Sequence, residues 1–192
     1  MANATTTKRT TRSKNTQPVE VQAENEATVE VVESKPVKVA KKIVAKDIDP
    51  NQYVGVRNGY QGTLIYKSTR TGEMFTWDGF GAEQEMELRE LRAAKNSSKG
   101  FFINNWFMFE EDWILDYLGV RQFYKNAISI DDFDDIFSMK ANELKATVSK
   151  LSNGQKRSVA YRAKELIDAQ EIDSLSVISA LEDALGIGLI EK

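Results

Sequence analysis

The residues of this chain best suited to chemistry are carboxylates, and they are densest in the acidic run at 131–135. A calcium-binding loop needs alternating oxygen ligands, a central glycine and a distal glutamate. Here Phe133 and Ile136 interrupt the aspartates, and no glycine follows them. The run therefore predicts the acidic start of a helix above an apolar face, and we expect no metal site.

Other catalytic groups are scarce. The chain contains no histidine and no cysteine, so the usual general base and the thiolate nucleophile are both missing. The pair Glu110/Glu111 could serve acid–base chemistry, but adjacent acids are common among 29 acidic residues. The glycines at 55–81 punctuate turns and form no phosphate-binding motif. We expect no catalytic residue and no cofactor.

A cationic stripe is the next candidate for binding. Lys150, Arg157 and Lys164 recur every seven residues, and Lys156 and Arg162 would widen the stripe. Asn153-Gly154 is expected to break the helix within it. Three interpretations stay open: a solvated helix face, a phosphate-binding surface and a surface for an acidic protein. The nucleic-acid interpretation rests on Lys156, Arg157 and Arg162, together with four basic residues near the N-terminus: Lys8, Arg9, Arg12 and Lys14.

Six large rings gather in the most apolar part of the chain. Acids follow them directly at 110–112, where they would repel phosphate, so a stacking platform for single strands is disfavoured. Core packing accounts for most of the rings. The remainder are predicted to dock on the C-terminal helices or on another subunit, where aromatic side chains serve as anchors. These docking candidates are Phe101, Phe102, Trp106, Phe107, Phe109 and Trp113.

The folded part of the chain that positions these candidates is expected to begin near Tyr53, because all 18 aromatic residues lie between Tyr53 and Tyr161. Residues 1–47 have no aromatic ring, carry a net charge of +3 and are interrupted by Pro18 and Pro36. This composition predicts a disordered N-terminal arm. The remainder carries −6, which argues against a broad nucleic-acid footprint over the folded body.

The segment 48–120 is predicted to be a small β-rich domain. Residues 63–67 and 74–77 read as a hairpin around a glycine-containing loop, and alternation at 83–88 predicts a further strand. A helix over 88–95, a strand over 105–109 and a helix over 112–118 follow. The strands suggest a small antiparallel sheet or an SH3-like barrel.

The segment 121–192 is predicted to be a helical domain. Four helices follow from apolar spacing and end signals: one capped by Ser129, one that contains Leu144, one from about Gln155, and one capped by Asp173 or Ser174. The fold class is therefore α+β: a disordered arm, a small β-rich unit and a C-terminal four-helix region.

Three stretches resemble a family of small uncharacterised or structural proteins of tailed bacteriophages. They are VRNGYQGTLIY from Val56, NSSKGFFINNW from Asn96, and GQKRSVAYRAK from Gly154 with the following DSLSVISALE. Together they span about residues 53–190. The resemblance implies a phage setting and brings no catalytic residue with it.

These features predict a non-enzymatic protein of the virion, in its tail, baseplate, neck or head, that is made in the host cytoplasm. Expected partners are other virion structural proteins, with self-association in a symmetric assembly. The alternative is a nucleic-acid-binding accessory protein of phage infection. No membrane span is expected, because no apolar run approaches the roughly 20 residues that one needs.

Overall fold

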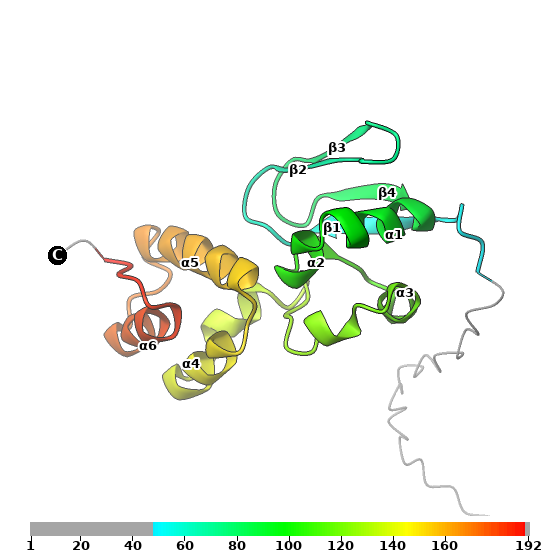
Figure 1. Cartoon of the computed structure of the whole chain (residues 1–192). Coiled ribbons are helices and arrows are strands. Elements are labelled where there is room, and N and C mark those ends of the chain that lie inside the picture. Colours follow the sequence, from blue (N-terminus) through cyan, green and yellow to red (C-terminus); the bar gives the residue numbers. More distant parts are fainter. Residues whose placement is uncertain (1–47, 191–192) are drawn as a thin grey trace, which may run out of the picture. The chain divides into compact units, whose positions relative to one another are not determined.

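The computed structural model describes residues 48–190, and the predicted arm at 1–47 lies outside the described residues. Within that range, short antiparallel strands are followed by a helical C-terminal part, which confirms a mixed α+β fold with small antiparallel sheets (Figure 1). No helix within residues 48–190 combines the length and apolar character that crossing a bilayer requires.

The larger sheet has three strands in the order β4-β1-β5. The central strand β1 (Tyr53–Asn58) pairs antiparallel with β4 (Glu83–Glu87) on one side and with the two-residue strand β5 (Phe107–Met108) on the other. Val54 and Val56 point into the core, as the two-residue period of a half-buried strand requires.

A hairpin forms a second, separate sheet. Strands β2 (Leu64–Lys67) and β3 (Met74–Trp77) pair antiparallel around the expected loop. Trp77 has no exposed surface, and its indole nitrogen donates a 2.7 Å hydrogen bond to the carbonyl of Val56. This bond fastens the hairpin to β1, although the two sheets do not merge into one.

Three helices cover the sheets. They are α1 (Leu88–Ser97), α2 (Gly100–Ile103) and α3 (Asp112–Leu118), and a short 3₁₀ helix η1 (Arg121–Phe123) follows them. Helix α3 ends as expected at Gly119, whose φ of +66° is the left-handed conformation that suits glycine at a helix end. Leu88, Leu91 and Ala94 of α1 join the valines of β1 in the first apolar core.

The strand predicted over 105–109 is shorter than expected. Asn105 is buried with a φ of +54°, and its side chain donates a 3.0 Å hydrogen bond to the carbonyl of Phe123. A residue in the left-handed region cannot continue a strand, so pairing with β1 begins only at Phe107.

A second apolar core lies among the C-terminal helices α4 (Ala141–Ser149), α5 (Asn153–Asp168) and α6 (Leu175–Leu185). Helices α4 and α6 lie side by side (Figure 1). The first of the four predicted helices is instead a 3₁₀ helix, η2 (Asp134–Ser138). Phe133 and Ile136 are three residues apart, which is one turn of a 3₁₀ helix, so both still lie in the core. The α-helix fails to form here because closely spaced aspartates are poor helix formers.

Candidate functional site

One polar site lies where α5 meets the β-rich part. Ser152 caps α5 by accepting the Gln155 amide and donates a 3.1 Å bond to the carbonyl of Asn104. The Gln155 side chain accepts from the amide of Ile128 at 3.1 Å and donates to its carbonyl at 2.7 Å. Gln155 therefore satisfies both backbone groups of Ile128, as a neighbouring strand would.

One helical turn further on, Ser158 completes this contact. Its hydroxyl donates a 2.9 Å bond to the carbonyl of Gly59 and accepts from the amide of Gln61. Gly154 permits the close approach, because a Cβ atom there would lie 2.1 Å from the backbone oxygen of Asn104. We call Ser152, Gly154, Gln155 and Ser158 the polar joint, since they fix the start of α5 to the β-rich part and to Ile128 in the segment that follows it.

Sequence reasoning did not find the polar joint. It placed Val159, Ala163 and Leu166 inward, and all three are buried. It also predicted that Asn153-Gly154 separates two helices; α4 and α5 are indeed separate, but the break lies at 150–152 and these two residues begin α5. The available signal was the three-residue spacing of Ser152, Gln155 and Ser158, which places three polar side chains on one face of a helix.

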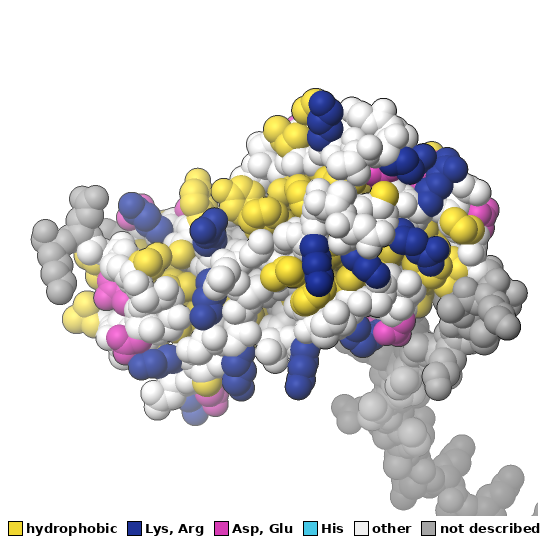
Figure 2. Space-filling view, viewed as in Figure 1, with side chains coloured by type: hydrophobic (Ala, Val, Ile, Leu, Met, Phe, Trp, Pro, Cys, Tyr) yellow, Lys and Arg dark blue, Asp and Glu magenta, His cyan; other side chains and the backbone are white. Residues whose placement is uncertain are grey.

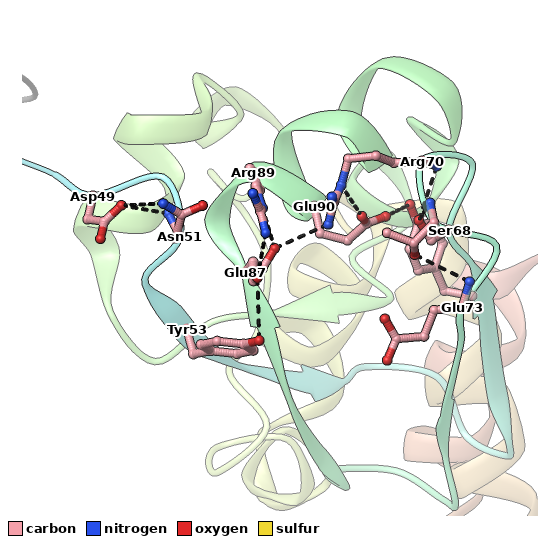
Figure 3. Close-up of polar contacts among 11 residues, drawn as sticks. Asp49, Asn51, Tyr53, Ser68, Arg70, Glu73, Glu87, Arg89 and Glu90 are labelled. Carbon is pink, nitrogen blue, oxygen red and sulfur yellow. Dashed lines mark hydrogen bonds and ion pairs between the residues drawn. The ribbon is translucent and has the colours of Figure 1, made fainter.

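A second polar cluster joins α1 to the hairpin. The carboxylate of Glu90 is 2 % exposed; one oxygen accepts a 2.8 Å bond from the Tyr66 hydroxyl and the other a 2.9 Å bond from Arg70 Nε. Glu87 lies between Arg89 and Arg70, and the Tyr53 hydroxyl also reaches it (Figure 3).

The pKa shifts and hydrogen bonds of this cluster indicate a structural role. The hydrogen bond from Arg89 lowers the pKa of Glu87, and the nearby charge of Arg70 lowers it further. Burial and then the bond to Glu90 raise the pKa of Tyr66 well above its usual value of 10. A surface hollow of about 250 Å³ adjoins the cluster. Both oxygens of the Glu90 carboxylate accept hydrogen bonds, and the raised pKa keeps Tyr66 neutral, so neither group is free to act as a base.

Three of the four aspartates of the predicted helix start face a cation or a hydroxyl. Asp131 and Glu110 both bind Arg57, at 3.0 and 3.2 Å. Asp134 binds Arg162 at 2.7 Å, and Asp132 accepts a bond from Ser129. Glu111, which is adjacent to Glu110, accepts a hydrogen bond from the indole nitrogen of Trp113. The two carboxylates of this pair therefore have different partners.

The aromatic docking candidates divide into two groups. Phe102 and Phe107 have no exposed surface and belong to the first apolar core. The other four are half-buried and pack against that core from outside: Phe101, Trp106, Phe109 and Trp113.

Two of the half-buried rings form a continuous row with Tyr60. The ring centroids of Tyr60 and Trp106 lie 6.0 Å apart, and those of Trp106 and Phe101 lie 5.6 Å apart. We call these three residues the aromatic row. The indole nitrogen of Trp106 has no hydrogen-bond partner within residues 48–190, whereas most buried indoles have one.

The basic candidates also divide. Arg162 is committed to Asp134 and Glu165, while Lys156 and Arg157 have no carboxylate within 4.0 Å among the described residues. Both line a hollow of about 300 Å³ with Leu185 and Ile187. Lys150, which directly follows α4, and Lys164 of α5 are exposed. Lys8, Arg9, Arg12 and Lys14 lie outside the described residues.

Comparisons of this chain with protein-family models, with curated proteins and with solved structures found no match. The resemblance to tailed-phage proteins therefore stays a prediction, and the function must be argued from the site itself.

Proposed function

We propose that this chain is a non-enzymatic structural or adaptor protein of a tailed-bacteriophage particle, which acts by binding other particle proteins. The phage setting rests on the three resembling stretches. The non-enzymatic role is supported by the cluster around Glu90, whose buried carboxylate is engaged by partners within the chain.

The aromatic row carries this proposal. Tyr60, Trp106 and Phe101 are half-buried rings in mutual contact, and their inner edges rest on a rigid core. Interfaces between proteins concentrate their binding energy in such aromatic anchors, because a pre-packed ring loses little conformational freedom on binding. We propose that the row contacts a neighbouring structural protein or a second copy of this chain.

Mass spectrometry of purified particles tests the proposal directly. We expect the chain in intact virions, with a copy number that reflects the symmetry of its neighbours. A host cytoplasmic protein of similar abundance should be absent from the same preparation. Reproducible absence of this chain from infectious particles would refute the structural role.

A variant links the aromatic row to incorporation. Trp106→Leu keeps an apolar side chain against the core and removes the ring, so we expect reduced incorporation into particles from cells with equal soluble protein. The control Tyr53→Ala removes a ring that is 59 % exposed and lies outside the row. Equal incorporation of the two variants would count against the row as the docking surface.

A further inference from the structure

Acidic residues are missing from three separate stretches of the folded body. Residues 91–109, 117–130 and 144–164 contain eleven Lys and Arg and no Asp or Glu. The remainder of 48–190 contains five Lys and Arg and 22 Asp and Glu. The net charge of −6 for the body therefore combines +11 on these stretches with −17 elsewhere.

The fold brings the three stretches together. Asn105 of the first donates to the carbonyl of Phe123 in the second, at 3.0 Å. Gln155 of the third pairs with both backbone groups of Ile128 in the second. Ser152 of the third donates to Asn104 of the first. Each stretch thus contacts both others, so segments that are distant in sequence form one region without acids.

Most cations of this region keep their charge free. Arg121, Lys145 and Arg162 pair with carboxylates that lie outside the three stretches. The other eight have no carboxylate within 4.0 Å among the residues that the structure describes. We call these eight the basic band: Arg92, Lys95, Lys99, Lys125, Lys150, Lys156, Arg157 and Lys164.

Three members of the basic band are held in place without losing charge. Arg92 lies over the ring of Tyr117, 4.7 Å from its centroid, and Lys99 lies 5.2 Å from that of Phe123. Lys95 donates a 2.8 Å hydrogen bond to the carbonyl of Leu118. Such contacts with rings and a carbonyl orient a cation and leave it positive, which lowers the entropy lost when an anion binds.

The charge separation is visible on the surface. Figure 2 shows Lys and Arg spread across the middle of one face, over α1, α2 and α5, while acidic side chains lie mainly toward the margins. Charges more than about 8–10 Å apart are largely screened at physiological salt. The excess of acids elsewhere therefore leaves a local positive field over this face.

We infer that the basic band binds the phosphate backbone of duplex nucleic acid. Neutral hydrogen-bond donors of the kind that contact phosphate lie exposed on the same stretches: Asn96, Gln122 and Asn153. Tyr161 is the one ring on these stretches that is exposed, so the band offers little platform for the stacked bases of a single strand. The inference is independent of the particle proposal and uses other side chains than the aromatic row, although Phe101 and Trp106 lie on the first of the three stretches.

Fluorescence anisotropy of the full chain with a short labelled DNA duplex of mixed sequence tests the basic band. Between about 50 and 200 mM salt, the affinity should fall linearly on a double-logarithmic plot. Lys125→Gln/Lys150→Gln should reduce the slope by about two and the affinity roughly 10- to 100-fold, since each lysine releases about one counterion.

The matched control is Lys67→Gln/Lys140→Gln, which removes the same charge from two exposed lysines outside the three stretches. Both proteins retain Lys8, Arg9, Arg12 and Lys14, so any contribution of the arm is constant. The control should keep the slope of the unmodified chain. Equal losses in both variants, or no binding at about 50 mM salt, would overturn the inference. Tighter binding of polyglutamate would overturn it in favour of an acidic protein partner, and tighter binding of a single strand would overturn the duplex assignment.

Discussion

At the scale of single residues, the contact between Tyr66 and Glu90 shows how a charge is kept inside this protein. Tyr66 is 1 % exposed and donates to a carboxylate that is 2 % exposed, while Arg70 supplies the opposite charge from the surface. A buried carboxylate is costly unless its oxygens are paired, and here both are. The cluster therefore fastens the hairpin to α1.

The same contact predicts an alkaline loss of stability. Burial and Glu90 raise the pKa of Tyr66 in the folded protein above the value of 10 expected when unfolded. A raised folded pKa gives stability that is complete below pH 10 and is lost as pH rises from there through the folded pKa. Tyr66→Phe removes this dependence and costs about 1–3 kcal/mol at neutral pH, because one oxygen of Glu90 loses its partner.

Urea midpoints measured at neutral pH and above pH 10 check this prediction. The unmodified chain should lose more stability across that interval than Tyr66→Phe does. Tyr161→Phe removes a hydroxyl from a ring that is 58 % exposed and should match the unmodified chain at neutral pH. An identical alkaline loss in Tyr66→Phe would show that Tyr66 does not carry the effect.

At the scale of elements, α5 is held at its first turns by polar groups and along its length by apolar ones. Ser152 and Ser158 bind backbone groups of the β-rich part, while Val159 and Ala163 face the second apolar core. The two interactions use different faces of one helix, which is how α5 contacts both parts at once.

Gly154→Ala tests this docking. The added methyl would lie 2.1 Å from a backbone oxygen of Asn104, and no side-chain rotation can relieve that overlap. Alanine favours a helix by about 1 kcal/mol over glycine, but the forced displacement should produce a net loss of about 1–3 kcal/mol. The control is Gly100→Ala on α2, where the nearest atom would lie at 3.8 Å. Chemical denaturation should show a loss for the first and none for the second; unchanged stability of Gly154→Ala would mean that α5 can shift.

At the scale of the whole folded body, two apolar cores are connected through the polar joint, and Phe80, from the connection between β3 and β4, packs on the second core against Phe133 with centroids 4.6 Å apart. The hydrogen bonds from Ser152 and Ser158 would be lost if one core unfolded alone, leaving the carbonyls of Asn104 and Gly59 unpaired. We therefore expect residues 48–190 to unfold as one unit.

The tryptophans make this expectation testable. Trp77, Trp106 and Trp113 all lie in the β-rich part, so tryptophan fluorescence reports on that part, while circular dichroism reports largely on the helices. Leu144→Ala empties a fully buried position in the second core and should cost about 2–5 kcal/mol. Both signals should shift together, with Lys140→Ala at an exposed position as the control. A fluorescence transition that stays unchanged in Leu144→Ala would show that the cores unfold independently.

Local chemistry made much of the secondary structure predictable. The hairpin around 68–73, the helix at 112–118 and its end at Gly119 follow from turn residues and apolar spacing within a few positions of each other. The short strand at 107–108 and the 3₁₀ helix at 134–138 were misjudged. In the first case, the left-handed conformation of Asn105 depends in part on a partner at Phe123, which local spacing cannot reveal.

By itself, the sequence determined the α+β class and the inward faces of the helices, because both depend on the period of apolar residues along a short stretch. It also determined which stretches lack acids. Only the tertiary structure decided that these stretches meet, that Phe102 and Phe107 are wholly enclosed, and that Arg162 is neutralised while Lys156 and Arg157 are not. Burial and ion pairing depend on which distant segments are brought into contact, and local periodicity does not encode those contacts.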